Sequence, residues 1–95
     1  MHMREKVIEQ KLVKEVKNKG GLCWKFTSPG TVGVPDRLLL LHKGKVAFVE
    51  VKAPGQTLRP IQVKRKKELE SLGFKVYVLD DINDIGGIID EILTS

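Results

Sequence analysis

The fold of this chain is decided by the stretch from Val34 to Lys52, which reads VPDRLLLLHKGKVAFVEVK. Two strand-like runs, residues 37–42 and 45–52, flank Lys43-Gly44. Apolar runs of this length on either side of a short turn sequence predict two antiparallel strands joined by a tight hairpin. We expect this hairpin to form the centre of a β-sheet, with the rest of the chain arranged around it.

The segment before the hairpin begins with a predicted helix. Within residues 4–19, three aliphatic side chains recur at the four-residue spacing of one helix face: Ile8, Leu12 and Val16. The pattern stops at Gly20-Gly21, a common helix end. Projection of the helix places Glu5 within the apolar stripe and Glu9 at its edge. A carboxylate on this face must be solvated, paired with a cation or bound to a ligand.

A strand and a loop are expected between this helix and the hairpin. Residues 22–27 are apolar and aromatic, whereas residues 28–35 are rich in Gly, Pro and Ser. We expect Cys23 and Trp24 to pack in the core. Because the chain has one cysteine, both an internal disulfide and a cysteine-based metal site are excluded.

The residues after the hairpin predict a helix, a strand and a last helix. The first of these is expected to begin near Pro60, where proline suits the first turn, and to end before Gly73. Residues 75–79 form the next strand and residues 82–93 an amphipathic helix. This order predicts an α/β fold in which helices flank a central mixed sheet.

Length and composition limit the class of protein. The 95 residues suffice for one hydrophobic core, so we expect a single domain over residues 1–95, with Met1-His2 interpreted as a cloning scar. No apolar run approaches the ~18 residues of a membrane span, and the first residues lack the apolar region of a secretory signal. We therefore expect a soluble intracellular protein that has no membrane partner.

The formal net charge of +5 favours a polyanionic partner. Basic residues crowd one short segment near the second predicted helix, namely Arg59, Lys64, Arg65, Lys66 and Lys67. They cover too many helix faces for all of them to bind DNA, so some are expected to be solvated. The candidate nucleic-acid contacts are Arg37, Arg59, Lys64 and Arg65.

Two carboxylates and a lysine are expected to meet at one end of the sheet. Residues two apart in a strand point to the same face, so Glu50 and Lys52 project side by side. Asp36 stands at the start of the preceding strand, and an antiparallel hairpin brings that point next to the end of the following strand. Asp36, Glu50 and Lys52 should therefore converge.

Neighbouring carboxylates repel each other, and a divalent cation is the natural compensation. Carboxylate and carbonyl oxygens suit Mg²⁺ or Mn²⁺, which keep several waters and bind phosphate oxygens. Such a cation lowers the pKa of a bound water and neutralises charge at an attacked phosphorus, and Lys52 would orient that water or hold a phosphate oxygen. The combination predicts phosphodiester hydrolysis.

Val34-Pro35-Asp36 followed by Glu50-Val51-Lys52 resembles the signature of the PD-(D/E)xK nuclease superfamily. The wider runs, residues 33–37, 48–55 and 60–62, resemble the virus-type replication-repair nuclease (VRR-NUC) branch in its short stand-alone form. This resemblance covers nearly the whole chain. It implies a three-layer α/β/α fold like that of restriction endonucleases and archaeal-type Holliday junction resolvases.

The resemblance also implies a catalytic glutamate on the first helix. Alignment with the resolvases through Leu12 and Gly20 assigns this role to Glu9, and Glu5 remains the alternative because the helix projection does not exclude it.

Further site residues follow from the same resemblance. It implies metal coordination by Asp36, Glu50 and the main-chain carbonyl of Val51, together with Glu9. Gln62 matches a glutamine at the start of the next helix that could touch the lysine or the phosphate. The alternative for Gln62 is a structural role in the first helical turn.

The activity expected from this resemblance is that of a Mg²⁺- or Mn²⁺-dependent DNA endonuclease acting on branched DNA such as a four-way (Holliday) junction. Two symmetric cleavage sites per junction predict a homodimer, with exposed apolar surface on the last helix or a sheet edge as its interface. The resemblance places the protein in the cytoplasm of a bacterium or a phage-infected bacterium. The alternatives are a DNA-structure-binding module that does not cut, and a nuclease subunit of a larger repair or restriction assembly.

Overall fold

A computed structural model of the chain describes residues 4–95, so the interpretation of Met1-His2 lies outside the described residues. The elements, in chain order, are α1 (Glu5–Asn18), β1 (Leu22–Lys25), β2 (Arg37–Leu41), β3 (Lys45–Val51), α2 (Pro60–Ser71), β4 (Lys75–Leu79) and α3 (Ile85–Thr94). Short 3-10 turns at His42–Gly44 and Ile82–Asp84 connect β2 to β3 and β4 to α3. The predicted order of helices and strands is confirmed.

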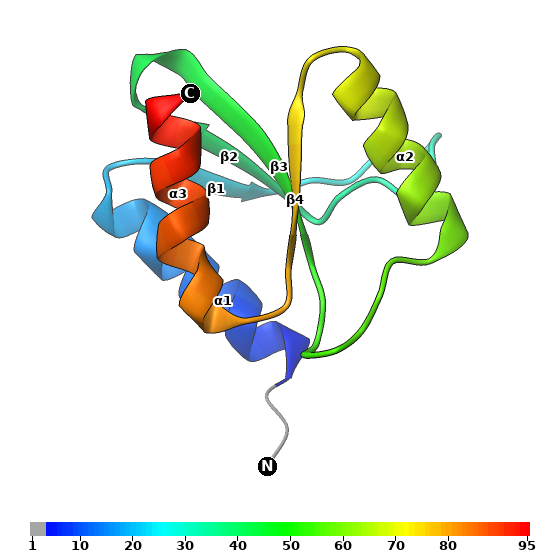
Figure 1. Cartoon of the computed structure of the whole chain (residues 1–95), viewed down its shortest axis with the longest axis horizontal. Helices are drawn as coiled ribbons and strands as arrows, with labels where there is room; N and C mark the ends of the chain where they lie inside the picture. The colour runs from blue at the N-terminus through cyan, green and yellow to red at the C-terminus, as the bar shows by residue number, and fades with distance from the viewer. Residues whose placement is uncertain (1–3) are drawn as a thin grey trace.

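The four strands form one mixed sheet in the order β1-β2-β3-β4. β2 pairs antiparallel with both β1 and β3, whereas β3 and β4 run parallel. The predicted hairpin is present, and its turn uses left-handed backbone at Lys43 (φ 63°) and Gly44 (φ 70°). Figure 1 shows α1 and α3 on one face of the sheet and α2 on the other, which confirms the three-layer α/β/α arrangement.

The hydrophobic core lies between the sheet and the helix pair α1 and α3. The predicted stripe of α1 is fully buried, and α3 buries its own apolar face in the same core. β3 contributes Ala47, Val49 and Val51 to this core. Because strand residues alternate between faces, Phe48 and Glu50 point to the opposite side, in the layer of α2.

The face of the sheet that carries α2 is only partly covered. α2 packs against β4, which is one edge strand. Trp24 lies on β1, the other edge strand, and shares its face with Leu38 and Phe48 through cross-strand pairing. Because α2 does not cover β1 on this face, Trp24 is 55% exposed, and the prediction that it packs in the core is wrong. Cys23, on the opposite face, does pack against the core.

None of the helices within residues 4–95 combines the length and the apolar composition needed to cross a membrane.

Candidate active site

Asp36 and Glu50 lie together where β2 begins and β3 ends. Asp36 accepts a hydrogen bond at its Oδ2 from the main-chain N–H of Val51, with a distance of 2.9 Å. Its own carbonyl oxygen accepts a bond from the N–H of Phe26 at 2.8 Å, so the strands on both sides fix its position. Glu50 immediately precedes Val51 and is 4% exposed. The structure thus brings the two predicted carboxylates together.

The loop that leads to Asp36 is held against α2. Gly33 has a φ of 82° and lies so close to Ile61 that an added β-carbon would come within 2.8 Å of that side chain. Arg65 donates from Nε to the carbonyl oxygen of Val32 at 2.7 Å and from Nη1 to Glu68 at 2.9 Å. Arg65, a predicted nucleic-acid contact, therefore holds this loop in place.

The surroundings of Glu50 raise the pKa of its carboxyl group. Burial, as the largest cause, and then the neighbouring carboxylate of Asp36 raise the pKa of Glu50 from 4.5 to about 8. The charge of Lys52 opposes this rise, and the charge of Glu5 adds to it. The structure thus brings Asp36 and Glu50 together, and Lys52 stands two residues after Glu50, just beyond the end of β3.

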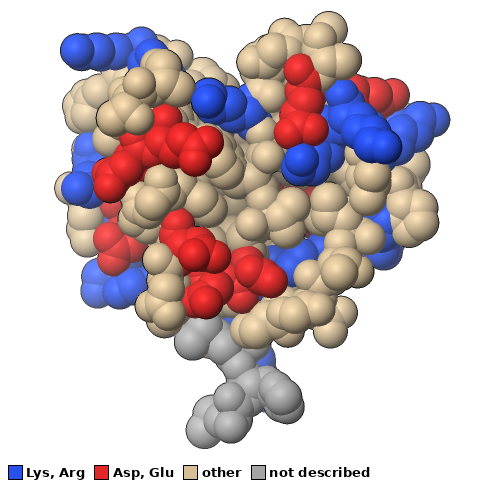
Figure 2. Space-filling model, in the orientation of Figure 1, with Lys and Arg blue, Asp and Glu red and all other residues tan. Residues whose placement is uncertain are grey.

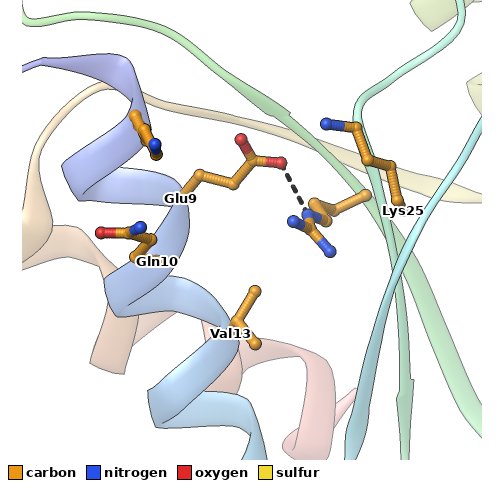
Figure 3. A pocket seen from close by; sticks show the side chains of 6 residues that line it. Glu9, Gln10, Val13 and Lys25 are labelled. Carbon is orange, nitrogen blue, oxygen red and sulfur yellow. Dashed lines mark hydrogen bonds and ion pairs between the residues drawn. The ribbon is translucent and has the colours of Figure 1, made fainter.

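The two candidate glutamates of α1 belong to different clusters. Glu5 acts on Glu50 through its charge. Glu9 instead accepts a 2.7 Å charge-assisted hydrogen bond from Nε of Arg37, and both line a cleft between α1 and the sheet (Figure 3). The helix projection could not separate them, because both residues lie along the same stripe, one turn apart. In the structure Glu9 is paired with Arg37, whereas Glu5 is exposed in the first turn of α1.

Gln62 is buried at the start of α2. Its Oε1 accepts a hydrogen bond from the main-chain N–H of Arg59 at 2.9 Å, which is the first-turn structural role left open by the sequence. The other two basic candidates near this helix, Arg59 and Lys64, are exposed. Figure 2 shows basic side chains gathered over α2, whereas acidic side chains gather over α3 and the segment that leads into it.

The site contains few side chains that could coordinate a metal ion. Among residues 4–95, no three His, Cys, Asp or Glu side chains lie together in a group that could hold a metal ion. The site offers two carboxylates, Asp36 and Glu50. This number fits Mg²⁺, which typically takes one or two carboxylates from a protein and completes its coordination with waters and substrate phosphates. A cation there would also offset the repulsion that raises the pKa of Glu50.

Sequence reasoning missed the basic lining around Arg37. Lys6 and Lys25 line the same cleft, and Lys25 is the direct cross-strand partner of Arg37. Strand alternation was the available signal, since it places Lys25 on the face of Cys23. The antiparallel pairing of β1 with β2 brings Lys25 next to Arg37, and this pairing does not follow from alternation within either strand.

Comparison with known proteins identifies relatives over most of the chain. The family model described as the VRR-NUC domain matches residues 9–80. Over 87 residues, the chain is 48% identical to "Putative nuclease p44" of Acyrthosiphon pisum secondary endosymbiont phage 1, covering 92% of each of the two sequences. A solved structure described as a VRR_NUC domain matches with a TM-score of 0.86 and 26% identity, covering 90% of this chain and 94% of that one.

Proposed function

Because this chain belongs to the VRR-NUC domain family, we propose that it is a metal-dependent endonuclease that hydrolyses phosphodiester bonds in DNA. The observation that carries the proposal is the pairing of a buried carboxylate, Glu50, with the partly exposed carboxylate of Asp36, with Lys52 two residues after Glu50, just beyond the end of β3. A protein that only bound DNA would gain nothing from carboxylates placed to meet phosphates, since like charges repel when no cation lies between them.

The roles of the central residues follow from their positions. Asp36 and Glu50, with the main-chain carbonyl of Val51, would hold Mg²⁺ or Mn²⁺. When bound, such an ion supplies a water of lowered pKa and positive charge next to the phosphorus. The N–H of Val51 fixes one oxygen of Asp36. Lys52 holds a non-bridging phosphate oxygen and stabilises the charge that grows there during attack.

We propose Glu5 as the carboxylate that α1 contributes. Its charge is the weakest of the causes that raise the pKa of Glu50. It lies in the first turn of α1 and is exposed, so that it can hold a water of the cation's outer shell. Glu9, to which the family resemblance assigns this role, is held by Arg37.

The proposed substrate is branched DNA, foremost a four-way junction. The chain contains no recognisable sequence-reading motif, such as a zinc finger or a recognition-helix pair, which favours recognition of DNA shape over base sequence. The phage origin of the relative supports a place in the cytoplasm of a phage-infected bacterium.

A homodimer would present two such sites to the two cleavage positions of a junction. We propose that it forms through an apolar surface on the α2 face of the sheet. Cross-strand pairing makes its members neighbours, and we call this surface the β1–β3 patch: Leu22, Trp24, Leu38, Leu40 and Val46. The side chains of Leu22 and Trp24 are at least half exposed, which is unusual for a contiguous apolar surface on a monomer. The last helix, the other expected interface, buries its apolar stripe in the core.

Trp24→Lys is expected to convert the dimer into a monomer, because it places a charge in the middle of the β1–β3 patch. Loss of a central interface tryptophan costs about 2 kcal/mol or more, which raises the dimer Kd by at least about 30-fold. Size-exclusion chromatography with light scattering measures the change from twice the chain mass of 10.7 kDa to the mass of one chain.

Leu72→Lys is the matched control, since Leu72 is 74% exposed and lies outside the patch. An unchanged mass in this variant is expected. A wild-type protein that is monomeric at every concentration, or an equal effect of Leu72→Lys, would contradict the proposed interface.

The wild-type protein is expected to cut a labelled four-way junction when Mg²⁺ or Mn²⁺ is present and not in EDTA, because the carboxylate pair needs a cation beside phosphate. Paired symmetric nicks are expected if two sites act on one junction. Denaturing gels compare the junction with flap, single-stranded and linear duplex DNA.

In the same assay, Glu5→Gln is expected to slow cleavage at saturating DNA.

Other outcomes would select other functions. Tight junction binding without cleavage under every metal condition would favour a binding module that does not cut. Cleavage that begins only when partner proteins are added would favour a nuclease subunit of a larger assembly. Loss of cleavage in Glu9→Gln together with full cleavage in Glu5→Gln would assign the helix role to Glu9.

A further inference from the structure

We propose that the cleft between α1 and the β1–β2 edge of the sheet is a second phosphate subsite. It would bind a phosphodiester next to the scissile one, through Lys6, Lys25 and Arg37. The inference rests on the proposed function, since its ligand is the backbone of the same DNA substrate. The cleft has a volume of about 530 Å³, and its lining consists of Lys6, Glu9, Gln10, Val13, Lys25 and Arg37.

The cleft carries an excess of positive charge. Lys25 and Arg37 are direct cross-strand partners, and like charges in such positions destabilise a sheet unless something neutralises them. Glu9 neutralises Arg37, but it is the only acidic side chain in a lining that also contains Lys6. Figure 3 shows Lys25 and Glu9 facing each other across the opening. An anion bound there would compensate the remaining positive charge.

Arg37 is held in position for such an anion. Its Nε donates to Glu9, and its Nη1 donates to the carbonyl oxygen of Cys23 at 3.4 Å. The side chain is 18% exposed, and a guanidinium has five N–H donors in a rigid plane. The N–H groups of Arg37 that make neither of these two bonds can donate to a further acceptor. Because Glu9 already fixes the guanidinium, little side-chain freedom is lost when a phosphate binds.

The cleft and the carboxylate site meet at the start of β2. Asp36 belongs to the carboxylate pair, and the next residue, Arg37, lines the cleft. Consecutive Cα atoms are about 3.8 Å apart and successive strand residues point to opposite faces, so the carboxylate pair and the cleft lie on the two faces of the sheet at the same end of β2.

This adjacency suits one continuous DNA strand. With the scissile phosphate at the carboxylate pair, a neighbouring phosphate can reach the cleft. Contacts to phosphates set the register and orientation of a strand without reading its bases, which agrees with recognition by shape. Lys6 and Lys25 are therefore assigned to binding, and no chemical step is assigned to them.

The test is the affinity for a fluorescent four-way junction, measured by anisotropy in EDTA at several KCl concentrations. The double variant Lys6→Met and Lys25→Met removes two charges and keeps the aliphatic stems. We expect its Kd to rise about tenfold at low salt and the slope of log Kd against log salt to fall by about one to two. Lys25→Arg, combined with the native Lys6, is expected to retain the wild-type slope.

Lys43→Met is the matched control, because Lys43 is exposed in the β2–β3 turn at the opposite end of these strands. An unchanged Kd and slope in the folded double variant, or an equal loss in Lys43→Met, would overturn the subsite. Stabilisation of the wild type by inorganic phosphate, with unchanged DNA affinity in the double variant, would also overturn it, in favour of a site for free phosphate.

A failure of the proposed nuclease function would be seen in the cleavage assay and not in the binding assay. In that case the wild type would cut DNA under no metal condition. The binding measurement in EDTA would still report on the subsite, because it requires neither metal nor cleavage.

Discussion

Replacement of Lys52 by methionine is expected to lower the rate of DNA cleavage about 100- to 1,000-fold, which is the usual effect of removing one group that stabilises transition-state charge. Lys52 lies within electrostatic reach of Glu50, at the end of β3, where its ammonium group can meet a phosphate oxygen. Methionine keeps the length and apolar stem of the side chain. Single-turnover cleavage of a four-way junction at saturating DNA measures the effect.

Asp36→Asn is expected to cause a loss of the same order by a different route. Its amide oxygen can still accept the bond from the N–H of Val51, so the local backbone is preserved while the negative charge is lost. Lys43→Met serves as the control, since Lys43 lies in the distant hairpin turn, and it should cut at the wild-type rate. Cleavage within tenfold of wild type in either Lys52→Met or Asp36→Asn would contradict the proposed site.

Glu50→Gln is expected to stabilise the metal-free protein at pH 8 while abolishing cleavage. The pKa of Glu50 is raised from 4.5 to about 8, mainly by burial and then by Asp36, so the folded protein holds its proton over a range in which the unfolded chain has lost it. The unfolding free energy of the wild type therefore falls as the pH rises from about 4.5 to about 8. Glutamine cannot ionise, and this loss disappears.

Melting curves at pH 5 and pH 8 in EDTA measure this difference. The Tm of Glu50→Gln should exceed that of the wild type at pH 8 and approach it at pH 5, and each 1 kcal/mol corresponds to about 4–8 °C in a domain of this size. Glu70→Gln is the control, since Glu70 is exposed and pairs with Lys66. Equal pH profiles for wild type and Glu50→Gln would show that the burial of Glu50 has no energetic consequence.

Addition of Mn²⁺ to the same samples extends this test to the proposed cation. Binding to the folded state raises stability by about 2.7 kcal/mol when the ligand concentration is 100 times Kd. We expect Mn²⁺ to raise the Tm of the wild type at pH 8 more than at pH 5, because a carboxylate must lose its proton to bind metal. Glu50→Gln should respond little at either pH.

The sequence determined the central hairpin of the sheet and the central part of the candidate site. The hairpin depends on the turn at Lys43-Gly44 and on alternation within two strands, both of which are local. Once the hairpin forms, Asp36 and Glu50 must lie at the same end of the sheet, and Lys52 must share the face of Glu50. The buried stripe of α1 followed from helical spacing in the same way.

Tertiary structure decided what local patterns could not. Glu5 and Glu9 lie one turn apart on one helix, and only the packing of α1 on the sheet pairs Glu9 with Arg37 while Glu5 stays exposed. Trp24 is exposed because α2 packs over β4 and leaves the other edge uncovered. Lys25 joins Arg37 only through the register of β1 on β2. Each of these outcomes depends on contacts between segments far apart in the chain, whereas the spacing of residues within one segment fixes only the face on which each side chain lies.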